Sequence, residues 1–70
     1  MENEETKKAV LTLAEWMAAE GLTDIDLADR REVSRMTVWR WRVKGVRPYR
    51  RDRVAINKMA GQDLIYGLAS

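Results

Sequence analysis

The 70-residue chain contains neither cysteine nor histidine, which removes disulfides and the usual zinc sites as sources of stability. A chain this short lies near the lower limit for a fold with one core, and such chains often need a staple or a partner subunit. Hydrophobic residues nevertheless make up 46% of the sequence, so the chain should fold rather than stay disordered. We expect a single domain over residues 1–70, in which residues 62–70 are a candidate dimerisation tail.

The spacing of apolar residues predicts a first helix over residues 4–20. Its inward face would carry residues spaced three or four positions apart, namely Val10, Leu13, Ala14 and Met17. Trp16 lies at the edge of this face, where we expect it to be half-buried. Gly21 is positioned to end the helix.

Two further short helices are predicted over residues 23–31 and 34–43, with Thr23 and Ser34 as their capping residues. A turn around Glu32 joins them. The inward-facing positions of this pair are Leu27, Ala28, Val33, Val38 and Trp41. Two short helices that are joined by a tight turn and share this apolar pattern are typical of a helix-turn-helix unit.

A fourth helix is predicted over residues 48–60, because Pro48 suits a first helical turn and Gly61 suits a helix end. Its inward face would carry Val54, Ala55, Ile56 and Met59. The tail at 62–70 suits one more helical turn or an extended arm. Since there is no repeat and no hairpin pattern, the sequence predicts an all-α fold of four to five short helices around a central helix-turn-helix.

Charged residues are segregated along the chain although the net charge is only +2. Residues 1–29 contain two lysines and eight carboxylates, whereas residues 30–58 contain eleven Lys and Arg residues and two carboxylates. Such segregation favours a polyanion as the partner of the basic half. The alternative is a solvated charged face that has no partner.

The helix predicted over residues 34–43 has an outer face that is rich in arginine and large apolar side chains. Residues two apart cannot share a helix face, so Trp39 points away from the inward Trp41. We expect this outer face to contact DNA bases through Arg35, Met36, Trp39 and Arg40. Arginine can bind guanine O6 and N7, while Met36 and Trp39 suit a thymine methyl or a sugar. In the alternative, Trp39 extends the core and Met36 is only an exposed side chain.

Other residues suit the DNA backbone. Ser34 begins a helix, where a hydroxyl and free backbone N–H groups can bind a phosphate. The flanking phosphates would be contacted by Lys44, Arg47, Arg50 and Arg51. These contacts should be independent of sequence and should weaken with salt. We therefore expect double-stranded DNA as the partner.

The stretch LTDIDLADRREVSRMTVWRWRVKGVRP resembles the core of the lambda-repressor/Cro-like helix-turn-helix family. The matching residues are Leu22, Thr23, Leu27, Ala28, Val33, Ser34, Thr37, Val38, Trp41, Gly45 and Pro48. The stretch RRDRVAINKMAG is similar to the helix that follows in short phage Cro-like proteins, so the resemblance covers residues 22–61. It implies a lambda-repressor-like fold and a sequence-specific DNA-binding transcriptional regulator, a phage-type Cro-like repressor whose third helix lies in the major groove. It also implies a phosphate contact at the start of the second helix, for which Thr23 suits better than the acidic Asp24.

Two positions depart from the pattern of this family. Glu32 stands where the family usually has glycine, and Arg31 stands where it has an apolar residue. A left-handed turn residue other than glycine costs about 1 kcal/mol. Arg31 is expected to bury the stem of its side chain and to keep its charge in water.

A module of this size would read a palindromic operator as a homodimer, at least on DNA, with its two recognition helices about 34 Å apart. The candidate dimerisation residues are Leu64, Ile65, Tyr66 and Leu68. In the alternative, these residues fold back onto the first helix of their own chain. Two other functions stay open: an excisionase-like architectural DNA binder and an antitoxin-type protein-interaction module.

Catalysis is not expected, since histidine and cysteine are absent and neither Ser34 nor Ser70 has a partner base. The sequence indicates no cofactor, metal or small-molecule ligand. No apolar run approaches the length of a membrane span, and the acidic start does not resemble a signal peptide. The expected location is the cytoplasm, that is, the bacterial cytoplasm or nucleoid.

Overall fold

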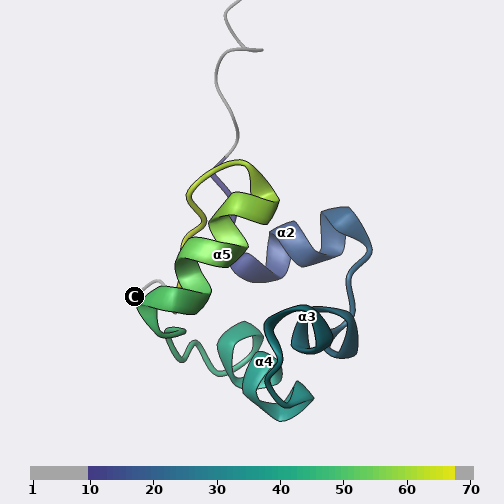
Figure 1. Ribbon diagram of the computed structural model, residues 1–70. Coiled ribbons are helices and arrows are strands. Elements are labelled where there is room, and N and C mark those ends of the chain that lie inside the picture. The colour runs from purple at the N-terminus through teal and green to yellow at the C-terminus, as the bar shows by residue number, and fades with distance from the viewer. Residues whose placement is uncertain (1–9, 68–70) are drawn as a thin grey trace, which may run out of the picture.

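Four helices make up the part of the chain that the computed structural model describes, residues 10–67 (Figure 1). They are α2 (Leu13–Glu20), α3 (Asp24–Arg31), α4 (Arg35–Arg42) and α5 (Arg50–Ala60). Within these residues no strand forms, and one isolated parallel bridge joins Thr12 to Ile65. The prediction of an all-helical fold of four to five short helices is confirmed for these residues, which form four.

Side-chain caps determine where the first three of these helices begin. The Thr12 hydroxyl accepts a hydrogen bond from the backbone N–H of Glu15, and the Glu15 carboxylate accepts one from the N–H of Thr12. Thr23 and Asp26 form the same reciprocal pair at the start of α3, and Ser34 caps α4 through its hydroxyl. Such caps satisfy N–H groups that have no partner inside the helix. The predicted caps Thr23 and Ser34 are confirmed.

The first helix is shorter than predicted, since it begins at Leu13. Before it, the chain pairs with the C-terminal segment: the Leu13 N–H donates to the Ile65 carbonyl (3.2 Å), and the Ile65 N–H donates to the Leu11 carbonyl (2.9 Å). Val10, predicted on the inward helix face, lies before the helix and is 69% exposed. Residues 4–9, which the prediction included, lie outside the described residues.

One apolar core joins all four helices and the C-terminal segment. The buried apolar residues are Leu13, Trp16, Met17, Leu27, Ala28, Val38, Trp41, Ile56 and Leu64. The set contains four residues that were predicted to face inward on the second and third helices, and for these the prediction is confirmed: Leu27, Ala28, Val38 and Trp41. Trp16 was expected to be half-buried, but it is only 4% exposed. It packs in the core with Leu13 and Met17.

The rotation of α5 about its axis differs from the prediction. Val54 and Met59 were expected to face inward, but they are 52% and 39% exposed. Ile56 is fully buried as expected, and Asp52, one helical turn before it, is also buried. Asp52 and Ile56 are four positions apart and therefore share a helix face. The inward face of α5 thus contains the charged Asp52, where the spacing of apolar residues had predicted Val54 and Met59.

The segment after α5 folds back onto its own chain. Leu64 is buried in the core, and the side-chain oxygen of Asn57 accepts hydrogen bonds from the Leu64 N–H (3.0 Å) and the Tyr66 hydroxyl (2.6 Å). Burial raises the pKa of Tyr66 to about 12. Leu64 and Tyr66 therefore pack on their own chain, as the alternative to a dimer surface expected, but the hydrogen bonds of Tyr66 join it to α5 and not to the first helix. Ile65 is 41% exposed, and Leu68 lies outside the described residues.

Candidate functional site

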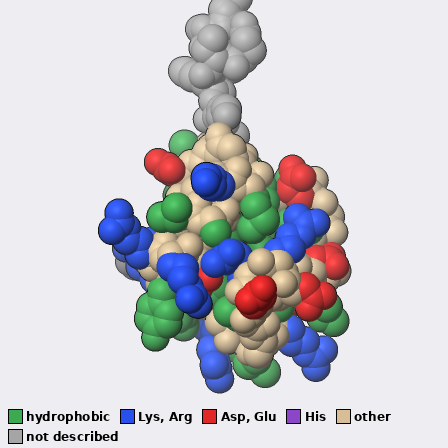
Figure 2. Space-filling view, viewed as in Figure 1, with side chains coloured by type: hydrophobic (Ala, Val, Ile, Leu, Met, Phe, Trp, Pro, Cys, Tyr) green, Lys and Arg blue, Asp and Glu red, His purple; other side chains and the backbone are tan. Residues whose placement is uncertain are grey.

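Basic side chains gather on one part of the surface. In Figure 2, Lys and Arg side chains lie mainly over α5 and around α4, whereas most acidic side chains lie on the right, over α2 and α3. The predicted phosphate-contact residues of this region are all exposed: Lys44, Arg47, Arg50 and Arg51. Tyr49, which lies between Arg47 and Arg50 in the sequence, is 82% exposed. The charge segregation along the sequence is therefore only partly kept in space, since some basic side chains also lie among the acidic ones on the right of this view.

The outer face of α4 holds the four residues predicted to contact bases. Arg35, Met36 and Arg40 are exposed, and Trp39 is half-buried. On the opposite face, Val38 is fully buried and Trp41 is 7% exposed. These two buried side chains fix the rotation of α4, so the four outer side chains face away from the core together. The prediction that Trp39 and Trp41 occupy different faces is confirmed.

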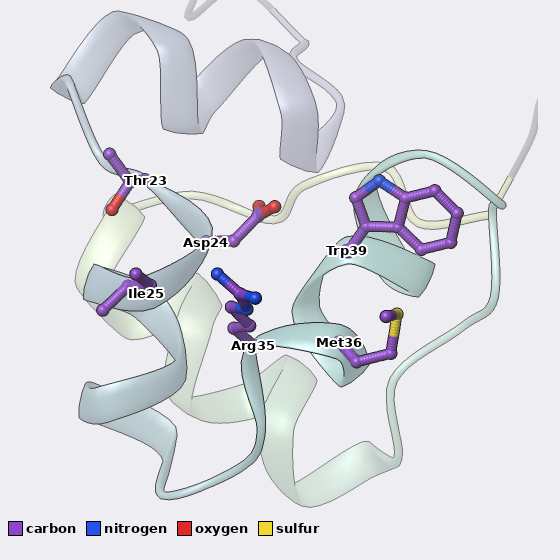
Figure 3. Close-up of a pocket in the computed structure, with 6 residues that line it drawn as sticks. All are labelled: Thr23, Asp24, Ile25, Arg35, Met36 and Trp39. Carbon is purple, nitrogen blue, oxygen red and sulfur yellow. The ribbon is translucent and has the colours of Figure 1, made fainter.

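An open groove of about 380 Å³ lies between the outer face of α4 and the start of α3 (Figure 3). Its lining residues are Thr23, Asp24, Ile25, Arg35, Met36 and Trp39. Ile25 and Met36 are 52% and 49% exposed, so both present apolar surface to the solvent. In Figure 3 the Arg35 side chain extends toward Asp24. The groove therefore combines apolar walls with one cation and one carboxylate.

The carboxylate in this groove, Asp24, is held by Arg42. The Arg42 guanidinium donates two hydrogen bonds to it, from Nε to Oδ1 (2.7 Å) and from Nη2 to Oδ2 (2.8 Å). These bonds lower the pKa of Asp24, the charge of Arg35 lowers it further, and the pKa of Arg42 is raised in return. Two cations therefore compensate the charge of Asp24, whereas Asp26 in the same first turn of α3 is exposed.

Lys44, just beyond α4, lies close to Trp39. Its Nζ atom is 5.6 Å from the centroid of the Trp39 ring, a distance at which a cation is attracted to the ring face. Lys44 is exposed. The pair therefore places a positive charge beside the aromatic wall of the groove.

Asp52, which lies within the basic residues 30–58, is buried and forms an ion pair with Arg31. Arg31 donates from Nε to Asp52 Oδ1 at 3.0 Å, and its Nη2 lies 2.9 Å from the same oxygen. This contact joins the last residue of α3 to the first turn of α5. Arg50 and Arg51 directly precede Asp52, so the same contact positions their helical turn relative to α3 and α4.

A further groove, also of about 380 Å³, lies on the other side of α4. Arg40 lines it together with Arg47, Tyr49 and Arg51. Arg40, a predicted base-contact residue, thus lines the same groove as Arg47 and Arg51, two of the predicted phosphate-contact residues.

Thr23 and Ser34, predicted to contact phosphates, are exposed at helix starts. The Thr23 hydroxyl accepts from the Asp26 N–H (3.2 Å), and the Ser34 hydroxyl accepts from the Thr37 N–H (3.1 Å). These capping bonds fix the orientation of both side chains. Their contact with a phosphate stays a prediction.

Sequence reasoning missed three features of this surface. Ile25 was not recognised as a groove residue, and Asp52 was not recognised as a buried partner. The pairing of Arg42 with Asp24, at the start of α3, was not recognised either. An apolar residue at an exposed helical position is the signal that could have identified Ile25. The two ion pairs join residues 18 and 21 positions apart, beyond the reach of helical periodicity.

Comparisons with models of protein families, with curated proteins and with solved structures gave no match. Within residues 10–67, no group of acidic side chains is arranged to hold a metal ion. In the same part of the chain, every helix is too short or too polar to cross a bilayer.

Proposed function

We propose that the protein is a sequence-specific double-stranded DNA-binding transcriptional regulator, a phage-type Cro-like repressor that binds a palindromic operator as a dimer. In this proposal α3, the turn at Glu32 and α4 form a helix-turn-helix of the lambda-repressor type, and α4 enters the major groove. Repression and phage origin rest on the family resemblance alone.

One observation carries this proposal: Val38 and Trp41 anchor α4 in the core, so Arg35 and Arg40 are exposed on its outer face, one beside each of the two grooves. The major groove of B-DNA admits an α-helix, and arginine is the side chain that most often reads guanine there. A helix whose arginines are exposed and whose rotation is fixed has the properties that base reading requires.

The charges around α4 support the same proposal. Lys44, Arg47, Arg50 and Arg51 are exposed beside it. The carboxylates of Asp24 and Asp52 are each bound by an arginine. A phosphate backbone that approaches α4 therefore meets these cations while Asp24 and Asp52 are already paired, and binding should release counterions and fall with salt.

A dimer is proposed because one module of this size covers only a short stretch of DNA. Two-fold symmetry would place two copies of α4 about 34 Å apart, one turn of the double helix. Leu64 belongs to the core of its own chain, so a dimer contact in this region would use exposed neighbours such as Ile65.

The proposal can be tested by selecting duplexes from a random DNA library at about 150 mM salt and sequencing those that bind. Enrichment of an inverted repeat, with half-sites one helical turn apart, is the expected result. An enriched site without symmetry would contradict the dimer but not the reading of sequence.

Two other outcomes would replace the proposal. Tight binding at low salt without enrichment would identify an excisionase-like architectural binder. Absence of duplex binding at any salt concentration would direct attention to an antitoxin-type role, in which the basic surface contacts a protein.

A further inference from the structure

We infer that Tyr49 is a neutral contact to the DNA backbone, in which its hydroxyl donates a hydrogen bond to a phosphate next to those that Arg47 and Arg51 bind. This inference rests on the proposed function and adds a residue to its binding surface. The backbone contacts predicted from the sequence are cations and helix-capping hydroxyls, so Tyr49 contributes a different kind of contact.

The side chain of Tyr49 neither packs in the core nor caps a helix. It is 82% exposed, and it precedes α5 without a capping hydrogen bond. Tyr66, the other tyrosine, is half-buried, and its hydroxyl donates to the side-chain oxygen of Asn57 (2.6 Å). Within residues 10–67 the Tyr49 hydroxyl has no such partner. Packing and capping therefore do not account for a tyrosine at this position.

The backbone that carries Tyr49, in the connection between α4 and α5 (Figure 1), is nevertheless fixed. Pro48 is fully buried, and its carbonyl accepts a hydrogen bond from Nη1 of Arg53 (2.7 Å). The Tyr49 carbonyl accepts from the backbone N–H groups of Asp52 (2.9 Å) and Arg53 (3.0 Å). A side chain on such an anchored backbone costs less entropy to order when a partner binds.

The groove beside Tyr49 indicates an anionic partner. The cations that line this groove together with Tyr49 are Arg40, Arg47 and Arg51. Its carboxylate, Asp52, is buried and paired with Arg31. Tyrosine hydroxyls are among the side-chain groups that bind phosphate oxygens in protein–DNA complexes. Since Arg40 also belongs to the outer face of α4, a duplex read by α4 would bring its backbone to this groove.

A neutral contact has a signature that an arginine contact does not have. The salt dependence of DNA binding reflects the cationic side chains that neutralise phosphates and release counterions. A tyrosine hydroxyl carries no charge at neutral pH, so its hydrogen bond adds affinity without releasing a counterion. Loss of the Tyr49 hydroxyl should therefore leave the salt slope unchanged, whereas loss of Arg50 should reduce it by about one.

The first test compares Tyr49→Phe with the wild-type protein on the selected operator and on unrelated duplexes at several salt concentrations. Phenylalanine keeps the ring and removes only the hydroxyl. The expected result is about tenfold weaker binding to every duplex, with the same slope of log K against log salt. Tyr66→Phe is the matched control, because it removes a hydroxyl outside the groove and should bind DNA like the wild-type protein.

A second test locates the phosphate. Each phosphate of the bound duplex is replaced in turn by an uncharged methylphosphonate. At the phosphate that Tyr49 binds, this replacement should weaken the wild-type protein clearly more than it weakens Tyr49→Phe, because the two changes remove the same contact. The same comparison with Arg47→Ala and Arg51→Ala locates their phosphates, which should be neighbours on the same strand.

Three results would overturn the inference and leave the proposed function standing. The first is wild-type affinity of Tyr49→Phe for all duplexes. The second is a loss confined to one base position, which would make Tyr49 a base contact. The third is a salt slope reduced by about one, which would show that the substitution disturbs an arginine contact. If no duplex binds at any salt concentration, both the proposed function and this inference fail.

Discussion

Arg31 and Asp52 form an ion pair in which Nη2 of Arg31 lies 2.9 Å from Oδ1 of Asp52, with side-chain exposures of 19% and 3%. The pair joins the end of α3 to the start of α5. Asp52 is the carboxylate nearest to Arg50 and Arg51 in the sequence, and in this pair it is buried. One contact therefore links helix packing to the charge of the proposed DNA-binding surface.

Replacing Asp52 by alanine should destabilise the fold by about 2–3 kcal/mol. Loss of one partner of a fully buried pair costs about 3–5 kcal/mol, and the value should be lower here because the partly exposed Arg31 can regain water. Urea unfolding followed by circular dichroism would measure the change. Asp29→Ala, at an exposed position on α3, is the control and should cost far less. Equal effects of the two substitutions would show that the ion pair does not stabilise the fold.

Local signals were sufficient to predict α3 and α4. Thr23 and Ser34 are capping residues whose partners lie three positions away, and Val38 and Trp41 follow the period of a helix. The start of α2 and the rotation of α5 were predicted incorrectly because they depend on distant partners. Ile65 pairs with the chain before α2, and Arg31, on another helix, binds Asp52.

In the candidate site, too, local sequence signals predicted some features, whereas others depend on how distant segments pack. Helical periodicity was enough to place Arg35, Met36 and Arg40 on one exposed face. The groove beside them was not predictable, since it depends on how closely the start of α3 approaches α4. Ile25 becomes a wall of the groove only through that packing.

Replacing Glu32 by glycine should stabilise the protein by up to about 1 kcal/mol. Glu32 has φ 59° and ends α3 in the left-handed conformation, which costs a residue with a Cβ about 1–2 kcal/mol, partly offset by the greater flexibility of glycine in the unfolded chain. Thermal or urea unfolding would measure the gain. Glu32→Ala, which removes the charge but keeps the Cβ, should give no such gain. A glycine variant no more stable than the alanine variant would show that the turn is not strained.

The Asp24–Arg42 pair should make stability depend on pH in the acid range. Hydrogen bonds from Arg42 hold the pKa of Asp24 below its ordinary value of 3.8, so the unfolded chain takes up a proton at a higher pH than the folded one. The contribution of the pair is therefore complete above about pH 5 and is lost as pH falls through the lower, folded pKa.

Urea unfolding of the wild-type protein and of Asp24→Asn at a series of pH values would measure this loss. The difference in unfolding free energy between the two should be largest near neutral pH and should shrink in acid. Arg42→Gln removes the same pair from the other side and should give a similar profile. A difference that stays constant with pH would contradict a stabilising ionised pair.

Arg40 and Arg50 should differ in how their loss affects DNA binding. Arg40 lies on the outer face of α4, where a bidentate contact with guanine contributes about 1–3 kcal/mol of discrimination. Arg40→Ala should therefore relax the preference at one base position of the selected operator. Arg50, exposed at the start of α5, is expected to contact a phosphate. Arg50→Ala should weaken binding to all duplexes alike and reduce the slope of log K against log salt by about one.

Arg40→Lys separates the two roles of the Arg40 side chain. Lysine keeps the charge but lacks the planar guanidinium that binds two acceptors, so this variant should lose base preference while keeping the salt dependence of the wild-type protein. Titration of the selected operator and of single-base variants at several salt concentrations would measure both quantities. If Arg40→Ala and Arg50→Ala lowered affinity uniformly across sequences, Arg40 would be a phosphate contact, and base reading would have to come from other residues of α4.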